Sequence, residues 1–155
     1  GYTMYGMRLG ALICMAQNRE TAKEFKDVMS VECRGSWSNG NRAAMTVLAD
    51  IMKDESLFES VVKERNRHMD TLKKRGDAFM EEASKEGLKV CPYDSGFFVT
   101  IPCRKAEEVS SKLQNDNIFA VTLGDGIRIS VASNTEKECR ALPAAIKKAM
   151  ASQGL

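Results

Sequence analysis

Three arginines have the sequence surroundings of anion-binding residues. Arg128 lies at the centre of residues 127–131, where branched apolar side chains alternate with polar ones. In a β-strand this alternation sends Arg128 and Ser130 to one face, so a cation projects from a rigid backbone. A planar guanidinium held in this way suits bidentate binding of a carboxylate, although a solvent-facing arginine gives the same pattern. Arg8 and Arg34 each lie where a turn meets a regular element, and each alone fits an ordinary surface charge.

Metal-binding chemistry has little support in the sequence. The single histidine, His68, has the surroundings of a solvated or partly packed helix residue, and the five cysteines include no CxxC pair. These spacings match no zinc motif, so we expect no metal site. Reduced thiols that act as small core residues are typical of a cytoplasmic protein, and this is the location that we predict.

Length and composition favour one soluble globular domain. The chain has 155 residues, of which 43% are apolar and 28% are charged, and its formal net charge is +2. No basic run is long enough to neutralise many phosphates, so we do not expect a nucleic-acid partner. The longest apolar run, residues 9–16, is far shorter than the roughly 20 residues that cross a bilayer, and we expect no membrane partner.

Hydrophobic periodicity predicts one strand and three helices in the first half of the chain. Residues 9–15 are short and apolar, as in a strand that is buried on both faces. Helical spacing of apolar residues follows in three segments, 19–33, 42–53 and 56–83. Asn18 is expected to cap the first of these helices, and Gly87 to end the last. The strand has no sheet partner in this half, so we expect its neighbours elsewhere and some apolar surface exposed or covered by another copy.

The second half predicts a small α+β unit, an antiparallel sheet with helices on one face. Its expected elements, in order, are strands at 88–90 and 97–101, a helix over 105–115, a hairpin of 118–123 with 127–132, and a helix over 136–151. The hairpin is expected around Gly124-Asp125-Gly126, because an Asp-Gly pair favours a tight turn.

Four short segments, in this order, carry a resemblance that covers essentially the whole chain. They are residues 3–11 (TMYGMRLGA), 34–39 (RGSWSN), 95–98 (SGFF) and 126–132 (GIRISVA). The first resembles the segment after the Schiff-base lysine of class I (fold type I) pyridoxal-phosphate-dependent aminotransferases, the aspartate and aromatic aminotransferase relatives. The second resembles that family's Arg-x-Thr-Trp-Ser-Asn loop, and the last two resemble strands of its small domain.

The resemblance implies a fold and an activity. It implies the small α+β domain of a fold type I aminotransferase, with a remnant strand and helices of the large α/β domain. Residues 1–53 would belong to the large cofactor-binding domain, 54–86 to a long connecting helix and 87–155 to the small domain. The implied activity moves an amino group between an amino acid and a 2-oxo acid through pyridoxal phosphate.

The resemblance also implies roles for the three arginines. Arg8 matches the arginine that pairs with the cofactor phosphate, and Arg128 matches the one that grips the substrate α-carboxylate. Arg34 matches the arginine that reaches from the neighbouring subunit to the second carboxylate of a dicarboxylic substrate, which implies a homodimer. Gly35 and Asn41 depart from the family's commonest forms, so both the dicarboxylic (aspartate) and the aromatic substrate class stay open.

The family's Schiff-base lysine falls outside these 155 residues. In the family it lies eight positions before the phosphate arginine, and eight positions before Arg8 is one residue ahead of Gly1. We therefore expect a C-terminal fragment of the enzyme, inactive by itself, with neither pyridoxal phosphate nor amino acid bound tightly. Two alternatives stay open: a fragment of a carbon-sulfur lyase or cyclopropane-forming synthase of the same fold, and a free-standing α+β binding module.

Overall fold

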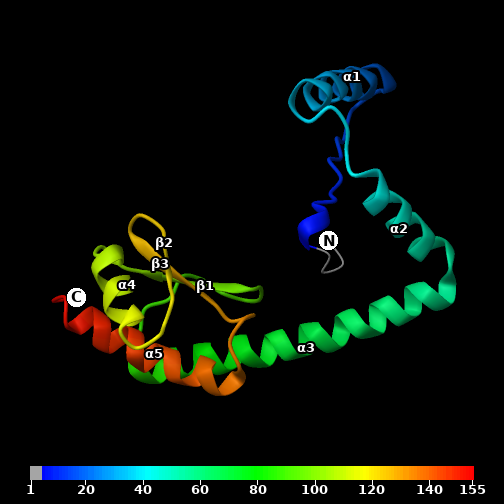
Figure 1. Cartoon of the computed structure of the whole chain (residues 1–155). Helices are drawn as coiled ribbons and strands as arrows, with labels where there is room; N and C mark the ends of the chain where they lie inside the picture. The colour runs from blue at the N-terminus through cyan, green and yellow to red at the C-terminus, as the bar shows by residue number, and fades with distance from the viewer. Residues whose placement is uncertain (1–4) are drawn as a thin grey trace. The chain divides into compact units, whose positions relative to one another are not determined.

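The computed structural model describes residues 5–155, which divide into two units between Arg65 and Asn66 (Figure 1). Residues 3 and 4 of the first aminotransferase-like segment lie outside the described residues. One helix, α3 (Glu55–Glu86), belongs to both units because the division falls inside it. The two units are described one after the other.

Asparagine caps begin two helices of the first unit, and the cap at Asn18 is the one that the sequence predicts. The Oδ1 atom of Asn18 accepts a 2.8 Å hydrogen bond from the Thr21 amide at the start of α1 (Arg19–Ser36). Asn41 does the same for the Ala44 amide at the start of α2 (Arg42–Lys53), at 3.1 Å. Such caps satisfy an amide that has no partner inside the helix. The predicted bounds of α2 are confirmed, whereas α1 continues three residues beyond its predicted end.

The strand predicted at residues 9–15 is wrong. These residues follow a short 3₁₀ helix, η1 (Tyr5–Met7), and run without helix or strand assignment. A strand needs the backbone hydrogen bonds of a neighbouring strand, and the described part of the first unit contains none. The apolar side chains are therefore uncovered, with Ile13 83% and Met15 98% exposed, and the expectation of exposed apolar surface in this half is confirmed.

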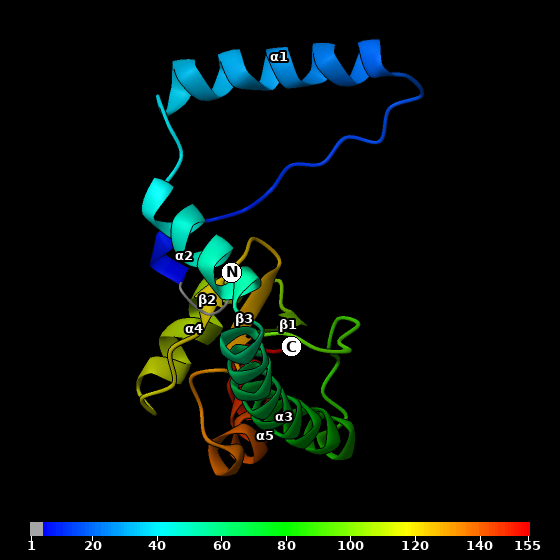
Figure 2. The same ribbon diagram turned by 90° about the vertical axis from the view of Figure 1, so that its right-hand side faces the viewer.

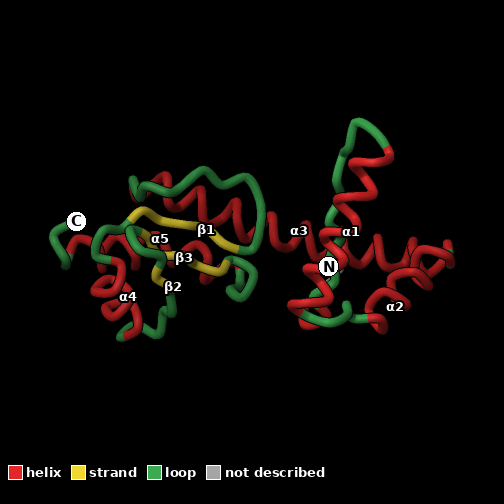
Figure 3. Tube along the Cα trace, turned by 90° about the horizontal axis from the view of Figure 1, so that it is seen from above, coloured by secondary structure: helices red, strands yellow, loops and turns green. Residues whose placement is uncertain are grey.

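The second unit is an antiparallel sheet with helices on one side, as predicted. Its elements are β1 (Phe98–Pro102), α4 (Ala106–Gln114), β2 (Val121–Thr122), β3 (Gly126–Ser130) and α5 (Glu136–Ala151). The strand order is β1-β3-β2, and both pairings are antiparallel. The three strands lie together in the tube view of Figure 3.

One face of this sheet forms the core. The buried side chains of the strands pack with those of α3, α4 and α5, and the cluster includes Val99, Ile101, Ile127, Ile129, Phe79, Val109, Leu113 and Ile146. Figures 1 and 2 show the C-terminal half of α3 running beside α5 along this face. All the buried residues of α3 lie in this half, so the second unit has a core of its own.

Two predicted details of the second unit are wrong. No strand forms at residues 88–90, where the nearby link to the sheet is a bond from the Cys91 amide to the Thr100 carbonyl at 2.9 Å. The hairpin forms, but its turn is not made by the Asp125-Gly126 pair that the sequence favours. The positive φ, 51°, is found at Gly124. A glycine at the first central position is the requirement of a II′ turn. Gly87 does end α3 as predicted, with a φ of 62°.

Candidate anion-binding site

Arg128 projects from the face of the sheet that the helices leave open. The alternation predicted from the sequence holds, because Ile127 and Ile129 are buried on the core side while Arg128 is only partly buried. The antiparallel register places Thr100 of β1 opposite Arg128 on one side and Val121 of β2 opposite it on the other. A central strand with partners on both sides gives this arginine a rigid base.

The guanidinium of Arg128 lies over an aromatic ring. Its central carbon is 4.4 Å from the ring centroid of Phe98, which is inside the range of a cation–π contact. The Nε atom of Arg128 is buried, and among the described residues it has no hydrogen-bond partner. A buried donor without a partner is costly, so native proteins rarely leave one unless a ligand or water meets it.

A second arginine of the unit, Arg75, is used for a hydrogen bond inside the protein. Arg75 of α3 donates a 2.7 Å hydrogen bond from Nη1 to the Ala132 carbonyl, just beyond the end of β3. This charge-assisted hydrogen bond fixes the backbone just after β3, the strand that carries Arg128. At Arg128, by contrast, no acceptor among the described residues meets the buried Nε.

Arg8 lies in the first unit, directly after η1. It has a φ of 51°, a left-handed conformation that non-glycine residues seldom adopt, and its side chain is exposed. Asn41 Nδ2 donates to the carbonyl of the preceding residue, Met7, at 3.2 Å. The Arg8 segment is therefore tied to the start of α2, which presents the cation at a defined place in this unit.

Arg34 lies in the last turn of α1 and is exposed. Its Nη1 donates hydrogen bonds to the hydroxyl and the carbonyl of Ser38, at 2.7 and 3.3 Å. Ser38 has a φ of 69°, so the chain folds back toward the arginine at this point. The loop and the arginine thus brace one another, while the rest of the guanidinium faces solvent.

Within the first unit, Arg8 and Arg34 lie beside different hollows. Arg34 lines a surface hollow with residues of α1 and the extended segment, including Leu12 and Cys14. Met7 and Leu9, on either side of Arg8, line a different hollow of the same unit. Arg128 belongs to the second unit. The prediction that all three serve one site stays a prediction.

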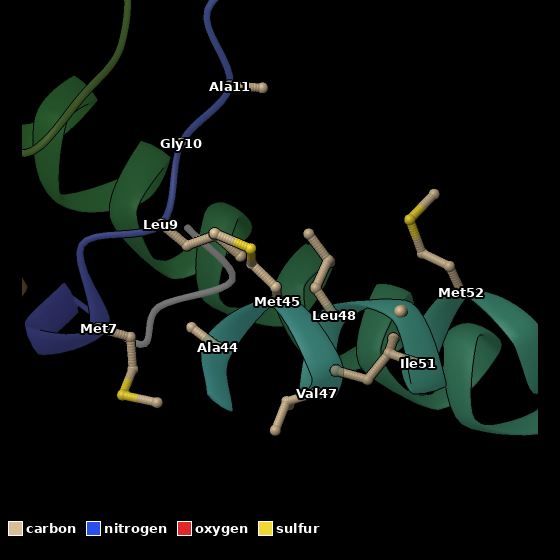
Figure 4. A pocket seen from close by; sticks show the side chains of 11 residues that line it. Met7, Leu9, Gly10, Ala11, Ala44, Met45, Val47, Leu48, Ile51 and Met52 are labelled. Atoms are coloured by element: carbon tan, nitrogen blue, oxygen red, sulfur yellow. The ribbon is translucent and has the colours of Figure 1, made fainter. Parts of the chain in front are cut away.

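An apolar groove in the first unit was not foreseen from the sequence. It has a volume of about 470 Å³ and runs between the segment after η1 and one side of α2, lined by Met7, Leu9, Ala44, Met45, Leu48 and Ile51 among others. In Figure 4, the side chain of Met45 extends toward Leu9 across this groove. The helical spacing of the α2 residues predicts an apolar face on this helix. Because residues 9–15 were expected to form a strand in a sheet, the sequence did not indicate that residues next to this segment line the other side of the groove.

Neither a metal-binding cluster nor a membrane-spanning helix is found in the described part of the chain. Over residues 5–155, no three His, Cys, Asp or Glu side chains gather as a metal site would require, and His68 is exposed on α3. None of the helices in this range is long and apolar enough to cross a bilayer.

The five thiols are free and differ in burial, with Cys91 partly buried between the two extremes. Cys103 and Cys139 are buried in the second unit, and desolvation raises the pKa of both thiols. Cys14 and Cys33 are exposed in the first unit. Burial of a thiol disfavours the thiolate, so the first pair behaves as small core residues.

The sequence and the fold both match known aminotransferases. The family model described as aminotransferase class I and II matches residues 1–146. No curated protein sequence matches the chain. An aminotransferase from Anaerococcus prevotii shares 29% identity, with a TM-score of 0.89 over 96% of this chain and 36% of that one.

Two further structures share the fold at lower identity. The broad specificity aminotransferase from Leishmania mexicana has 19% identity and a TM-score of 0.70 over 96% of this chain and 36% of its own. A single mutant of Thermus thermophilus aspartate aminotransferase has 16% identity and a TM-score of 0.63 over 82% of this chain and 35% of its own. The chain thus spans about a third of the length of the structures that it matches. With its sequence matched almost throughout, this chain belongs to the class I and II aminotransferase family.

Proposed function

We propose that this chain is the C-terminal part of a pyridoxal-phosphate-dependent aminotransferase. The enzyme moves an amino group between an amino acid of the aspartate or aromatic class and a 2-oxo acid. One observation carries the proposal beyond family membership: the buried, unpartnered Nε of Arg128 on the open face of the sheet. Such a donor fits the carboxylate that amino acids and 2-oxo acids have in common.

Arg128 is the residue that we assign to the substrate α-carboxylate. A guanidinium offers two parallel N–H groups in one plane, and a carboxylate offers two oxygens at matching spacing. Because Arg128 stands on the central strand, a bound carboxylate takes its orientation from the sheet. Holding the substrate in one orientation lowers the entropic part of the barrier, and the charge on Arg128 offsets that of the carboxylate.

Arg8 is the residue that we assign to the cofactor phosphate. Pyridoxal phosphate, when bound, acts as the electron sink for the reaction. The exposed guanidinium of Arg8, in a segment tied to α2 by Asn41, fits a phosphate group, since arginine binds phosphate with paired N–H donors. The family's lysine position falls ahead of Gly1, so we propose that the 155 residues alone are inactive and hold the cofactor weakly.

Arg34 is the residue that we assign to a neighbouring subunit's substrate. The resemblance of residues 34–39 to the family's loop supports this role, and the brace from Ser38 keeps the arginine at a fixed place after α1. The role requires a homodimer and favours a dicarboxylic substrate. The five free thiols support a cytoplasmic location for the enzyme.

The domain division that we propose follows the same resemblance. Residues 1–53 belong to the cofactor-binding domain, 54–86 form the connecting helix, and 87–155 form the small domain. The uncovered groove of the first unit supports this division, because an apolar face of this kind is normally covered by other parts of a domain. The core around β1, β3 and α5, which Phe79 and Ala83 of the connecting helix complete, supports a small domain that packs on the end of that helix.

The experiment that tests the proposal compares two arginine variants of the full-length enzyme. Arg128→Lys keeps the charge but removes the planar pair of donors, and we expect kcat/KM for transamination to fall about 100-fold or more. Arg104→Lys, at an exposed arginine of the same unit, is the control and should leave kcat/KM unchanged. Full activity of Arg128→Lys would remove the assigned role. The 155-residue chain with pyridoxal phosphate and amino acid should form no 2-oxo acid.

A further inference from the structure

We propose that Phe98 is a positioning residue for Arg128. Its ring fixes the plane of the guanidinium, so that the edge of the guanidinium, and not its face, meets a carboxylate. The inference rests on the proposed role of Arg128 as the carboxylate ligand. It assigns a task to an aromatic side chain that makes no hydrogen bond of its own.

The register of the sheet brings the two side chains together. Phe98 pairs with Ser130, which is two residues beyond Arg128 on β3, so Phe98 and Arg128 are diagonal neighbours on one face of the sheet. Long and aromatic side chains reach across such a diagonal. The guanidinium carbon lies 4.4 Å from the ring centroid, and residue Phe98 is 46% exposed.

The ring is the group that can hold the plane. An arginine without a partner has many rotamers, and ordering them on binding lowers affinity. No group among the described residues accepts a hydrogen bond from the buried Nε, so an ion pair does not fix the plane at this atom. Ser130, the nearest hydroxyl along β3, has its Oγ engaged by the Ser133 amide at 3.2 Å. The contact with the Phe98 ring is the one that the structure shows for the guanidinium.

Stacking also leaves the right atoms available. The N–H groups of a guanidinium lie in its plane, so a ring against its face blocks none of them. A second ring supports the first, because Phe97 packs edge-on against Phe98 with centroids 6.4 Å apart. The two rings form an apolar support beside the guanidinium of Arg128.

The test follows Arg128 itself by NMR in the full 155-residue chain, with 2-oxoglutarate as the carboxylate probe. Three variants are compared with the unsubstituted chain. Phe98→Leu removes the ring, Phe98→Tyr restores one, and Phe119→Leu removes an aromatic ring that is 75% exposed in the same unit and has no contact with Arg128 among the described interactions. The readouts are the Nε–H resonance of Arg128, its exchange with solvent, and the apparent Kd for the probe.

We expect Phe98→Leu to move the Nε–H resonance, to speed its exchange and to raise Kd about fivefold, the factor that corresponds to one cation–π contact. Phe98→Tyr and Phe119→Leu should keep the original values. A Phe98→Leu chain with an unchanged resonance and Kd would overturn the positioning role.

Failure of the proposed function has a different signature in the same experiment. If the Nε–H resonance of the unsubstituted chain does not respond to 2-oxoglutarate, Arg128 is not the carboxylate ligand. Arg128→Lys is measured beside them by the apparent Kd alone, and a Kd that Arg128→Lys raises but Phe98→Leu leaves unchanged contradicts the positioning role alone. Unfolding curves of each variant show whether a loss of binding is instead a loss of fold.

Discussion

The phenol of Tyr93 lies against Gly76 so closely that no side chain fits at that position of α3. A Cβ atom at residue 76 would be 2.5 Å from the Tyr93 oxygen and 2.9 Å from a ring carbon. The same hydroxyl donates a 2.8 Å hydrogen bond to the Gly96 carbonyl, near the start of the strand that carries Phe98. Tyr93 therefore joins the long helix to the loop before β1, and desolvation raises its pKa.

Gly76→Ala should destabilise the chain although alanine is the better helix former. The gain in helix propensity is about 1 kcal/mol, but the new methyl must displace Tyr93 and its hydrogen bond, so we expect a net loss of about 1 kcal/mol. Urea unfolding measures the change. Gly35→Ala in α1, where an added Cβ meets nothing within 4 Å, is the matched control and should not destabilise. A stabilised Gly76→Ala chain would show that Tyr93 moves freely.

The stability of the fold should fall at acidic pH because Glu81 loses its ion pairs there. Hydrogen bonds from Lys85 and Arg140 lower the pKa of Glu81 from an ordinary 4.5 to about 2. A lowered pKa means that the carboxylate stabilises the fold above pH 4.5, and that this contribution is lost as the pH falls toward 2.

Arg140→Gln removes one of these donors and should move the pKa of Glu81 upward. An NMR titration of the Glu81 carboxyl carbon measures it directly. Arg104→Gln, which changes the net charge by the same amount, serves as the control. An unchanged pKa in Arg140→Gln would mean that Lys85 alone sets the value.

The capping box of α5 predicts a measurable loss at Thr135. Its hydroxyl accepts from the Glu138 amide, and the Glu138 carboxylate accepts from the Thr135 amide, so two unpartnered donors are satisfied together. Thr135→Ala should cost about 1 kcal/mol in free energy of unfolding. Thr71→Ala, whose hydroxyl bonds the Arg67 carbonyl inside α3, is the comparison and should cost clearly less. Equal losses would contradict a special role for the cap.

Alkylation should separate the thiols by burial. Under native conditions, iodoacetamide should modify the exposed Cys14 and Cys33 and spare Cys103 and Cys139, whose pKa values are raised by desolvation. Peptide mass spectrometry identifies the modified residues, and urea should make all five reactive. Rapid native modification of Cys139 would show that the core around α5 opens readily.

Local signals explain why some elements were predictable to the residue. The bounds of α2 and α5 follow from caps within a few positions, Asn41 and Thr135, and from apolar spacing along one helix. The strand at residues 9–15 failed because a strand depends on a neighbour, and the composition of one segment cannot supply that neighbour.

The candidate site also has one feature that the sequence predicts and two that it does not. Alternation along one strand places Arg128 on the open face, and the structure agrees. The stacking of Phe98 and the burial of Nε depend on how β1 registers against β3, two segments far apart in the sequence. Pattern within a segment does not determine that register, so these two features could be found only in the fold.

The unsatisfied Nε of Arg128 couples the binding of an anion to the stability of the fold. A donor that is dry and unbonded weakens the native state, and an anion that meets it adds its binding free energy to that state alone. By linkage, a ligand at about 100 times its Kd stabilises the fold by about 2.7 kcal/mol. The melting temperature of the second unit should therefore rank carboxylates by affinity, without any turnover.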